Sequence, residues 1–100
     1  MILREKDRQT LVQLFCQIES QIEVLAYGRR VNNTAHEGSD LDLVIRSKNN
    51  EPISNELFAY LQEQLQQSNI PILVELRDWN TLPTSFQRQI EKNCEQLYAN

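Results

Sequence analysis

The segment from Ala26 to Ile45, AYGRRVNNTAHEGSDLDLVI, limits what this chain can fold into more than any other stretch. Its final apolar run begins with two aspartates one residue apart, Asp40 and Asp42. Successive side chains of a β-strand point to opposite faces, so both carboxylates project from one face of a sheet. Like charges held side by side repel each other, and a bound cation relieves that repulsion. The pair predicts a Mg²⁺ site that also takes substrate phosphates, and a solvated strand start is the simpler alternative.

A glycine turn precedes this pair. The apolar run IEVLAY, from Ile22 to Tyr27, ends at Gly28, where a backbone without a side chain can approach a phosphate closely. Arg29 and Arg30 follow immediately. Cationic groups and amides on one side, with the carboxylates on the other, would enclose a metal-bound polyphosphate. His36 lies in the same loop and is given no role, because a surface loop histidine is more often incidental.

A third carboxylate, Glu75, stands in the middle of a later apolar segment, ILVELRDW. An unpaired carboxylate is costly to bury, so Glu75 needs a partner or an open edge of the sheet. A metal shared with Asp42 would satisfy it. An ion pair with a nearby arginine would satisfy it equally well, and the candidates are Arg29, Arg30 and Arg77. The spacing leaves both alternatives open.

Helical and strand periodicities alternate along the remaining chain. In order, they predict a helix from about Glu5 to Glu19, a strand from Ile22 to Tyr27, an ordered loop with one helical turn from Arg29 to Ser39, a strand from Asp40 to Arg46, a helix around Leu57 to Leu65, a strand from Ile72 to Trp79, and a helix from Thr84 almost to the end, lined by Phe86, Ile90, Cys94 and Leu97. Thr84 and Gln87 resemble a capping box. The pattern predicts one α/β (α+β) domain over residues 1–100, with a three-stranded sheet flanked by helices.

The composition excludes several classes of function for this chain. One hundred residues suffice for a single core but not for a separate acceptor-binding domain. The net charge of −4 argues against a general nucleic-acid-binding surface. No stretch approaches the roughly 20 apolar residues of a membrane span, and the charged N-terminal residues are unlike a signal peptide, so we expect a cytoplasmic location. Cys16 and Cys94 fall in helical apolar stripes and are expected to be reduced core residues.

The motifs together resemble the minimal nucleotidyltransferases of the DNA polymerase β-like superfamily. That family's pattern is Gly-Ser, ten residues, then Asp-x-Asp on a strand, with a third carboxylate on a later strand. Gly28 begins the pattern here, Arg30 to Ser39 supply the ten residues, and Ser39-Asp40-Leu41-Asp42 follows the Ser-Asp-x-Asp core. VELRDW places Glu75 at the third carboxylate. Arg29 stands where the family has serine and Glu75 where it usually has aspartate, two departures that bear on activity.

The resemblance implies a mixed sheet in the polymerase β-like fold and a transfer reaction. AMP would move from ATP to a hydroxyl, with Asp40, Asp42 and Glu75 as catalytic residues holding two Mg²⁺ ions. Gly28, Arg29, Arg30 and Ser39 would seat the β- and γ-phosphates. A catalytically degenerate binding module and an antibiotic-modifying nucleotidyltransferase are the alternatives.

The resemblance is closest to small proteins encoded beside a helical HEPN protein in toxin–antitoxin pairs. It implies a HEPN partner that supplies the acceptor hydroxyl, and homodimerisation is the competing way to complete the cleft. The Gln-rich face of the second predicted helix and the strand end near Trp79 are candidate contact surfaces. The face is made of Gln62, Gln64, Gln66 and Gln67.

Overall fold

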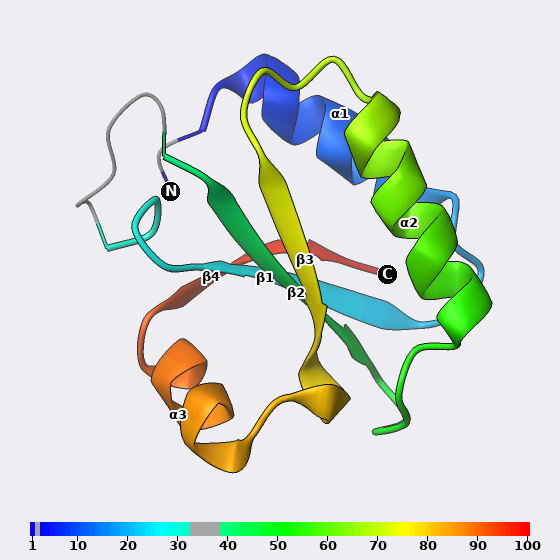
Figure 1. Cartoon of the computed structure of the whole chain (residues 1–100), viewed down its shortest axis with the longest axis vertical. Coiled ribbons are helices and arrows are strands. Elements are labelled where there is room, and N and C mark those ends of the chain that lie inside the picture. Colours follow the sequence, from blue (N-terminus) through cyan, green and yellow to red (C-terminus); the bar gives the residue numbers. More distant parts are fainter. Residues whose placement is uncertain (2, 33–38) are drawn as a thin grey trace.

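A computed structural model describes residues 1, 3–32 and 39–100. The elements follow one another as α1 (Glu5–Cys16), β1 (Ile22–Tyr27), β2 (Leu41–Ser47), α2 (Asn55–Gln67), β3 (Val74–Asp78), a 3₁₀ turn η1 (Trp79–Thr81), α3 (Thr84–Lys92) and β4 (Cys94–Ala99) (Figure 1). The strands form one sheet in the order β3-β2-β1-β4. β1 runs antiparallel to both of its neighbours, and β2 and β3 are parallel. The mixed sheet is confirmed, with four strands where three were predicted.

Both faces of the sheet are covered. Alternate residues of the strands face α1 and α2, whose apolar sides build the larger core. Its fully buried members include Leu11, Phe15, Val24, Leu41, Leu43, Ile45 and Leu61. On the opposite face a smaller cluster joins the sheet to η1 and α3 through Leu25, Tyr27, Val44, Trp79 and Ile90. The side chains of β1, β2 and β3 that are discussed below project from this second face of the sheet.

The predicted helix after residue 52 forms as expected. Ser54 caps α2 by accepting a hydrogen bond from the Leu57 amide at 3.2 Å, and Leu61 and Leu65 are buried beneath the helix. Gln62, Gln66 and Gln67 are exposed and Gln64 is half-buried, so this face of α2 is open to solvent. Trp79, by contrast, is buried with the Arg46 guanidinium 5.0 Å from its ring, so its side chain offers no open contact surface.

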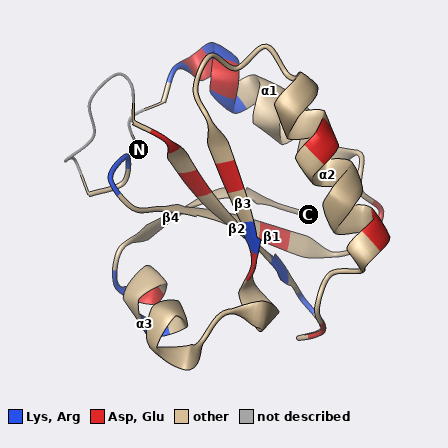
Figure 2. Ribbon diagram, viewed as in Figure 1, with Lys and Arg blue, Asp and Glu red and all other residues tan. Residues whose placement is uncertain are grey.

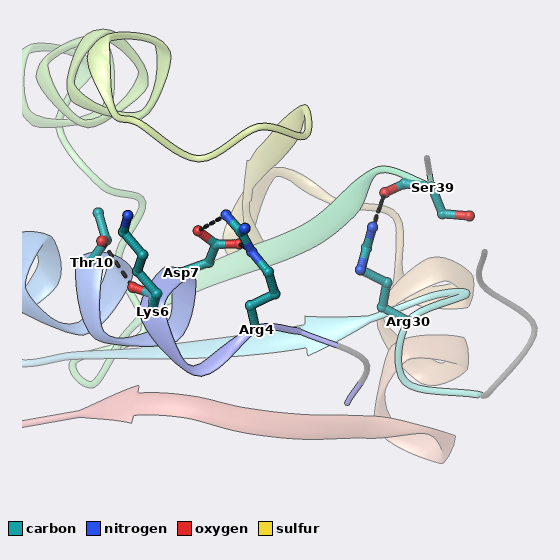
Figure 3. A network of polar contacts seen from close by, with 6 residues as sticks. All are labelled: Arg4, Lys6, Asp7, Thr10, Arg30 and Ser39. Atoms are coloured by element: carbon teal, nitrogen blue, oxygen red, sulfur yellow. Dashed lines mark hydrogen bonds and ion pairs between the residues drawn. The ribbon is translucent and has the colours of Figure 1, made fainter. Parts of the chain in front are cut away.

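The first predicted helix is shorter than expected, because α1 ends at Cys16. At its start Arg4 donates hydrogen bonds to the buried Asp7 carboxylate at 2.9 and 3.1 Å (Figure 3). Both cysteines are free thiols, as predicted, but Cys16 is exposed and Cys94 is half-buried in a strand, so neither is a helical core residue.

The prediction of one helix from Thr84 nearly to the end is wrong. α3 stops at Lys92, and residues 94–99 form β4 along β1. A β-bulge opposite Val24 and Leu25 interrupts the pairing, and Leu97 and Tyr98, adjacent in sequence, both contact the larger core. Because the bulge removes the two-residue alternation of a regular strand, the apolar spacing resembled that of a helix.

The capping box predicted at Thr84 is also absent. Pro83 is the N-cap of α3 and no side chain caps the helix. The Gln87 side chain instead donates a hydrogen bond to the Trp79 carbonyl at 2.7 Å, which ties α3 to η1. Among the described residues, no helix has both the length and the apolar character needed to cross a membrane.

Candidate active site

Gly28 forms the turn that ends β1. Its φ of +81° lies in the left-handed region that side chains disfavour. A Cβ at this position would lie 2.6 Å from the Oδ2 atom of Asp42, closer than real Cβ contacts come. Val31 and Asn32 both donate backbone hydrogen bonds to the Gly28 carbonyl at 3.1 Å, so residues 28–32 form a turn as predicted, while residues 33–38 of the predicted loop lie outside the described residues. A residue without a Cβ is therefore required at position 28, both by the backbone conformation and by the closeness of the Asp42 carboxylate.

Four side chains form a row across the sheet beside this turn. Glu75 of β3 pairs in register with Asp42 of β2, Asp42 with Tyr27 of β1, and Tyr27 with Cys94 of β4. Directly opposed residues of neighbouring strands project to the same face, so Asp42 lies between Glu75 and Tyr27. Acidic positions of β2 and β3 accordingly lie side by side (Figure 2).

The carboxylates of this row repel each other. Burial raises the pKa of Asp42 above its ordinary value, and the negative charges of Glu75 and Asp40 raise that pKa further. Arg77 opposes the shift in part, and its Nη2 lies 3.9 Å from Oε2 of Glu75. The arginine interaction considered for Glu75 is thus present as a long, half-exposed ion pair. A pair of this kind contributes little to stability.

Asp40 is exposed and immediately precedes β2, which begins at Leu41 rather than at Asp40. Its charge still reaches Asp42. No three acidic, histidine or cysteine side chains among the described residues converge in a geometry ready to hold a metal. The donor chemistry nevertheless fits Mg²⁺, since Asp42 and Glu75 supply adjacent carboxylate oxygens whose repulsion a cation would relieve.

The two arginines after Gly28 have different environments. Arg29 is exposed, whereas Arg30 is buried and donates from Nε and Nη2 to the Ser39 carbonyl at 3.0 and 2.7 Å (Figure 3). Arg30 thereby links the turn after β1 to the approach to β2. His36 lies outside the described residues. The structure thus brings Gly28, Asp42 and Glu75 together and turns Arg30 inward as a brace of the loop.

Sequence reasoning missed two residues of this face, Tyr27 and Phe86, whereas Arg77 was already a candidate ion-pair partner of Glu75. Tyr27 is 8% exposed, and its hydroxyl is buried without a hydrogen-bond partner among the described residues. The Phe86 ring meets the Tyr27 ring edge-on at 5.9 Å, and the Arg77 guanidinium lies 6.0 Å from the Phe86 ring. The position of Tyr27 directly before Gly28 is the signal that could have identified the tyrosine.

Burial also raises the pKa of Tyr27, and the negative charge of Asp42 raises it further. Arg77 lowers that pKa in part, while Glu75 adds a smaller increase. The Tyr27 hydroxyl therefore remains protonated in the folded protein at neutral pH and can act as a hydrogen-bond donor.

Residues 9–100 match the family described as "Polymerase beta, Nucleotidyltransferase". The chain belongs to the polymerase beta nucleotidyltransferase family. The resemblance carried by Gly28, Asp40 and Asp42 is thereby confirmed, as is the expected fold class, with the added fourth strand.

Individual relatives agree with that family membership. Over 76 residues, 76% of the chain, it is 37% identical to a "Probable protein adenylyltransferase MntA" of Haemophilus influenzae. The match spans 65% of that protein, just under two thirds of its length.

Solved structures share the fold at lower identity. A crystal structure of a toxin–antitoxin with AMP-PNP matches 94% of this chain and 74% of its own with a TM-score of 0.75 and 20% identity. A tri-AMPylated Shewanella oneidensis HEPN toxin in complex with an MNT antitoxin matches 98% of this chain and 74% of its own, with a TM-score of 0.69 and 17% identity.

Proposed function

We propose that this nucleotidyltransferase transfers AMP from ATP to a hydroxyl group, releasing pyrophosphate. The observation that carries the proposal is the register of Asp42 against Glu75 beside the Gly28 turn. The acceptor oxygen would form a bond to the α-phosphorus while the bond to the β-phosphate oxygen breaks. The hydroxyl proton would pass to a carboxylate of the pair, and the electrons of the broken bond would leave with pyrophosphate.

The chain's own groups divide this work. Asp40, Asp42 and Glu75 would hold two Mg²⁺ ions, which when bound lower the pKa of the acceptor hydroxyl and neutralise phosphate charge. The backbone of the Gly28 turn, the exposed Arg29 and the Ser39 hydroxyl would contact the β- and γ-phosphates. Arg30 would contribute by holding the Ser39 carbonyl, which keeps both sides of the loop at a fixed separation.

For the acceptor, we propose a hydroxyl side chain of a HEPN protein encoded by the adjacent gene, with this chain as the antitoxin. The support is the likeness to MntA, named a probable protein adenylyltransferase, and to a complex in which a HEPN toxin is tri-AMPylated. In-line transfer requires the acceptor oxygen to be held about 3–3.5 Å from the phosphorus. A docked partner is the simplest means of holding it there.

Co-expression with the adjacent gene product tests the proposal. The purified partner, incubated with this chain, ATP and Mg²⁺, should gain the mass of one or more AMP groups in intact-mass spectrometry. Asp42→Asn, which preserves side-chain size, is the matched inactive control. A partner whose mass stays unchanged with the wild-type chain would reject the protein acceptor, and an adenylylated small molecule in the same mixture would identify a different one.

A catalytically degenerate antitoxin that neutralises its partner by binding is the second candidate. Two observations favour it: Arg29 in place of the family's serine, and the absence among the described residues of three converged metal ligands. Nucleotide binding separates the two. A chain that binds its partner but no ATP at millimolar concentration with Mg²⁺ supports the binding module and contradicts the transferase.

A further inference from the structure

Tyr27 is held rigidly next to the carboxylate pair. It is the last residue of β1, in register with Asp42 on one side and Cys94 on the other. Its ring lies on the α3 face of the sheet, with the Phe86 ring edge-on at 5.9 Å and an interplanar angle of 87°. These contacts hold the ring on the face of the sheet that also carries Asp42.

The hydroxyl at the end of this ring has no acceptor for its proton among the described residues, although hydrogen bonding from Arg77 helps to lower its pKa. It is buried and makes no hydrogen bond of ordinary geometry with the described residues, whereas most buried polar side-chain atoms have one. The charges that act on it belong to Asp42, Arg77 and Glu75. Arginine carries donors only, so Arg77 cannot accept the tyrosine proton. The acceptors facing Tyr27 are therefore the two carboxylates.

In the register of the strands, Asp42 is the acceptor nearer to Tyr27. It lies directly opposite Tyr27, while Glu75 is one strand further away and has Arg77 3.9 Å from its Oε2. Gly28 confines Asp42 from another side, since a Cβ there would lie 2.6 Å from Oδ2. A hydrogen bond with Glu75 is among the causes that raise the pKa of Asp42. When both carboxylates are ionised, as metal ligands are, both are acceptors only, so a donor to Asp42 then has to come from outside the pair.

We propose that Tyr27 is a positioning residue whose hydroxyl donates a hydrogen bond to the Asp42 carboxylate when the pair binds a metal–nucleotide. This inference rests on the proposed nucleotidyl transfer. A hydrogen bond to a metal-binding carboxylate fixes its orientation and strengthens cation binding. A phenol suits this role because it is neutral, and so orients Asp42 without cancelling the negative charge that attracts the cation. Arginine or lysine at the same place would compete with the cation.

Tyr27→Phe tests the inference because it removes only the hydroxyl and keeps the ring against Phe86. Tyr98→Phe is the matched control, since Tyr98 is a half-buried tyrosine of β4 whose ring stacks on Phe15 in the larger core. Mn²⁺ binding, measured by electron paramagnetic resonance with a non-hydrolysable ATP analogue, should weaken about tenfold or more in Tyr27→Phe and stay unchanged in Tyr98→Phe. Affinity within twofold of wild type in Tyr27→Phe would overturn the inference.

The stability of the metal-free proteins tests whether Tyr27 has a purely structural role. Removing a buried hydroxyl whose proton has no acceptor should leave the urea midpoint of Tyr27→Phe equal to wild type or higher. A lower midpoint, accompanying the weaker Mn²⁺ binding, would overturn the inference in favour of a fold defect. With active wild type, the Mn²⁺ concentration needed for half-maximal turnover should rise by a similar factor in Tyr27→Phe. Wild type that binds Mn²⁺–nucleotide but transfers nothing rejects the proposed reaction alone, and wild type that binds neither rejects both.

Discussion

Replacing Gly28 with alanine should damage the fold and the site together. A residue with a Cβ in the left-handed region costs about 1–2 kcal/mol. The new Cβ would also lie 2.6 Å from Oδ2 of Asp42, and turning that carboxylate away from its rotamer adds about 1 kcal/mol. We expect Gly28→Ala to lower the free energy of unfolding by about 2–3 kcal/mol. For a domain of this size that lowers Tm by roughly 10–20 °C.

Two comparisons separate the terms of this estimate. Asn50 also has a positive φ, +62°, but lies exposed in a turn, so Asn50→Ala should show the backbone cost alone, about 1 kcal/mol. In an Asp42→Ala background the overlap disappears, and Gly28→Ala should cost about 1 kcal/mol less than in wild type. Urea denaturation measures all of these variants. A Gly28→Ala effect below about 0.5 kcal/mol, or one unaffected by Asp42→Ala, would refute the close-contact reasoning.

Four further predictions concern the same site. Asp42→Asn should abolish Mg²⁺–nucleotide binding in calorimetry without lowering the Tm of the metal-free protein, because it relieves repulsion. Because the pKa of Asp42 is raised, the folded protein keeps a proton that the unfolded chain loses. The free energy of unfolding of the metal-free protein should therefore fall as pH rises from about 4 through the folded pKa. Asp42→Asn should reduce this pH dependence in urea titrations. Arg29→Ser should leave ATP affinity within about tenfold, roughly 1.4 kcal/mol, whereas newly acquired binding would show that Arg29 obstructs the site. Arg30→Gln should destabilise by about 1.5–3 kcal/mol in urea, since it removes charged hydrogen bonds to the buried Ser39 carbonyl, and a neutral result would contradict the bracing role.

Sequence patterns were sufficient for the elements whose apolar residues repeat regularly. β1 was identified from its short apolar run IEVLAY, and β2 from the alternation of Leu41, Leu43 and Ile45. α2 was identified because Leu61 and Leu65 recur at helical spacing. β4 was missed because its bulge, opposite Val24 and Leu25, breaks the alternation that marks a strand. Local periodicity carries no information about such a bulge, which depends on the pairing partner.

The site was predictable in its residue types but less so in its arrangement. The Gly28 turn and the aspartates could be found from motif spacing. The adjacency of Asp42 and Glu75 depends on β2 and β3 being parallel neighbours, which no local pattern specifies. Arg30 reads in sequence as a second phosphate-binding cation, and only the tertiary structure reveals that it is buried against Ser39.

The row that crosses all four strands also has a consequence for how the protein folds. Each pairing in it joins separate segments of the chain, and Tyr27 meets Cys94 only when the last strand has joined β1. Contacts of this kind form slowly, because long loops must close before the pairing compensates for the lost entropy. The pair of carboxylates therefore exists only in chains in which β2 and β3 have paired. A metal–nucleotide would bind only the completed sheet and would stabilise it by mass action, so ligand-induced protection from proteolysis would report on folding itself.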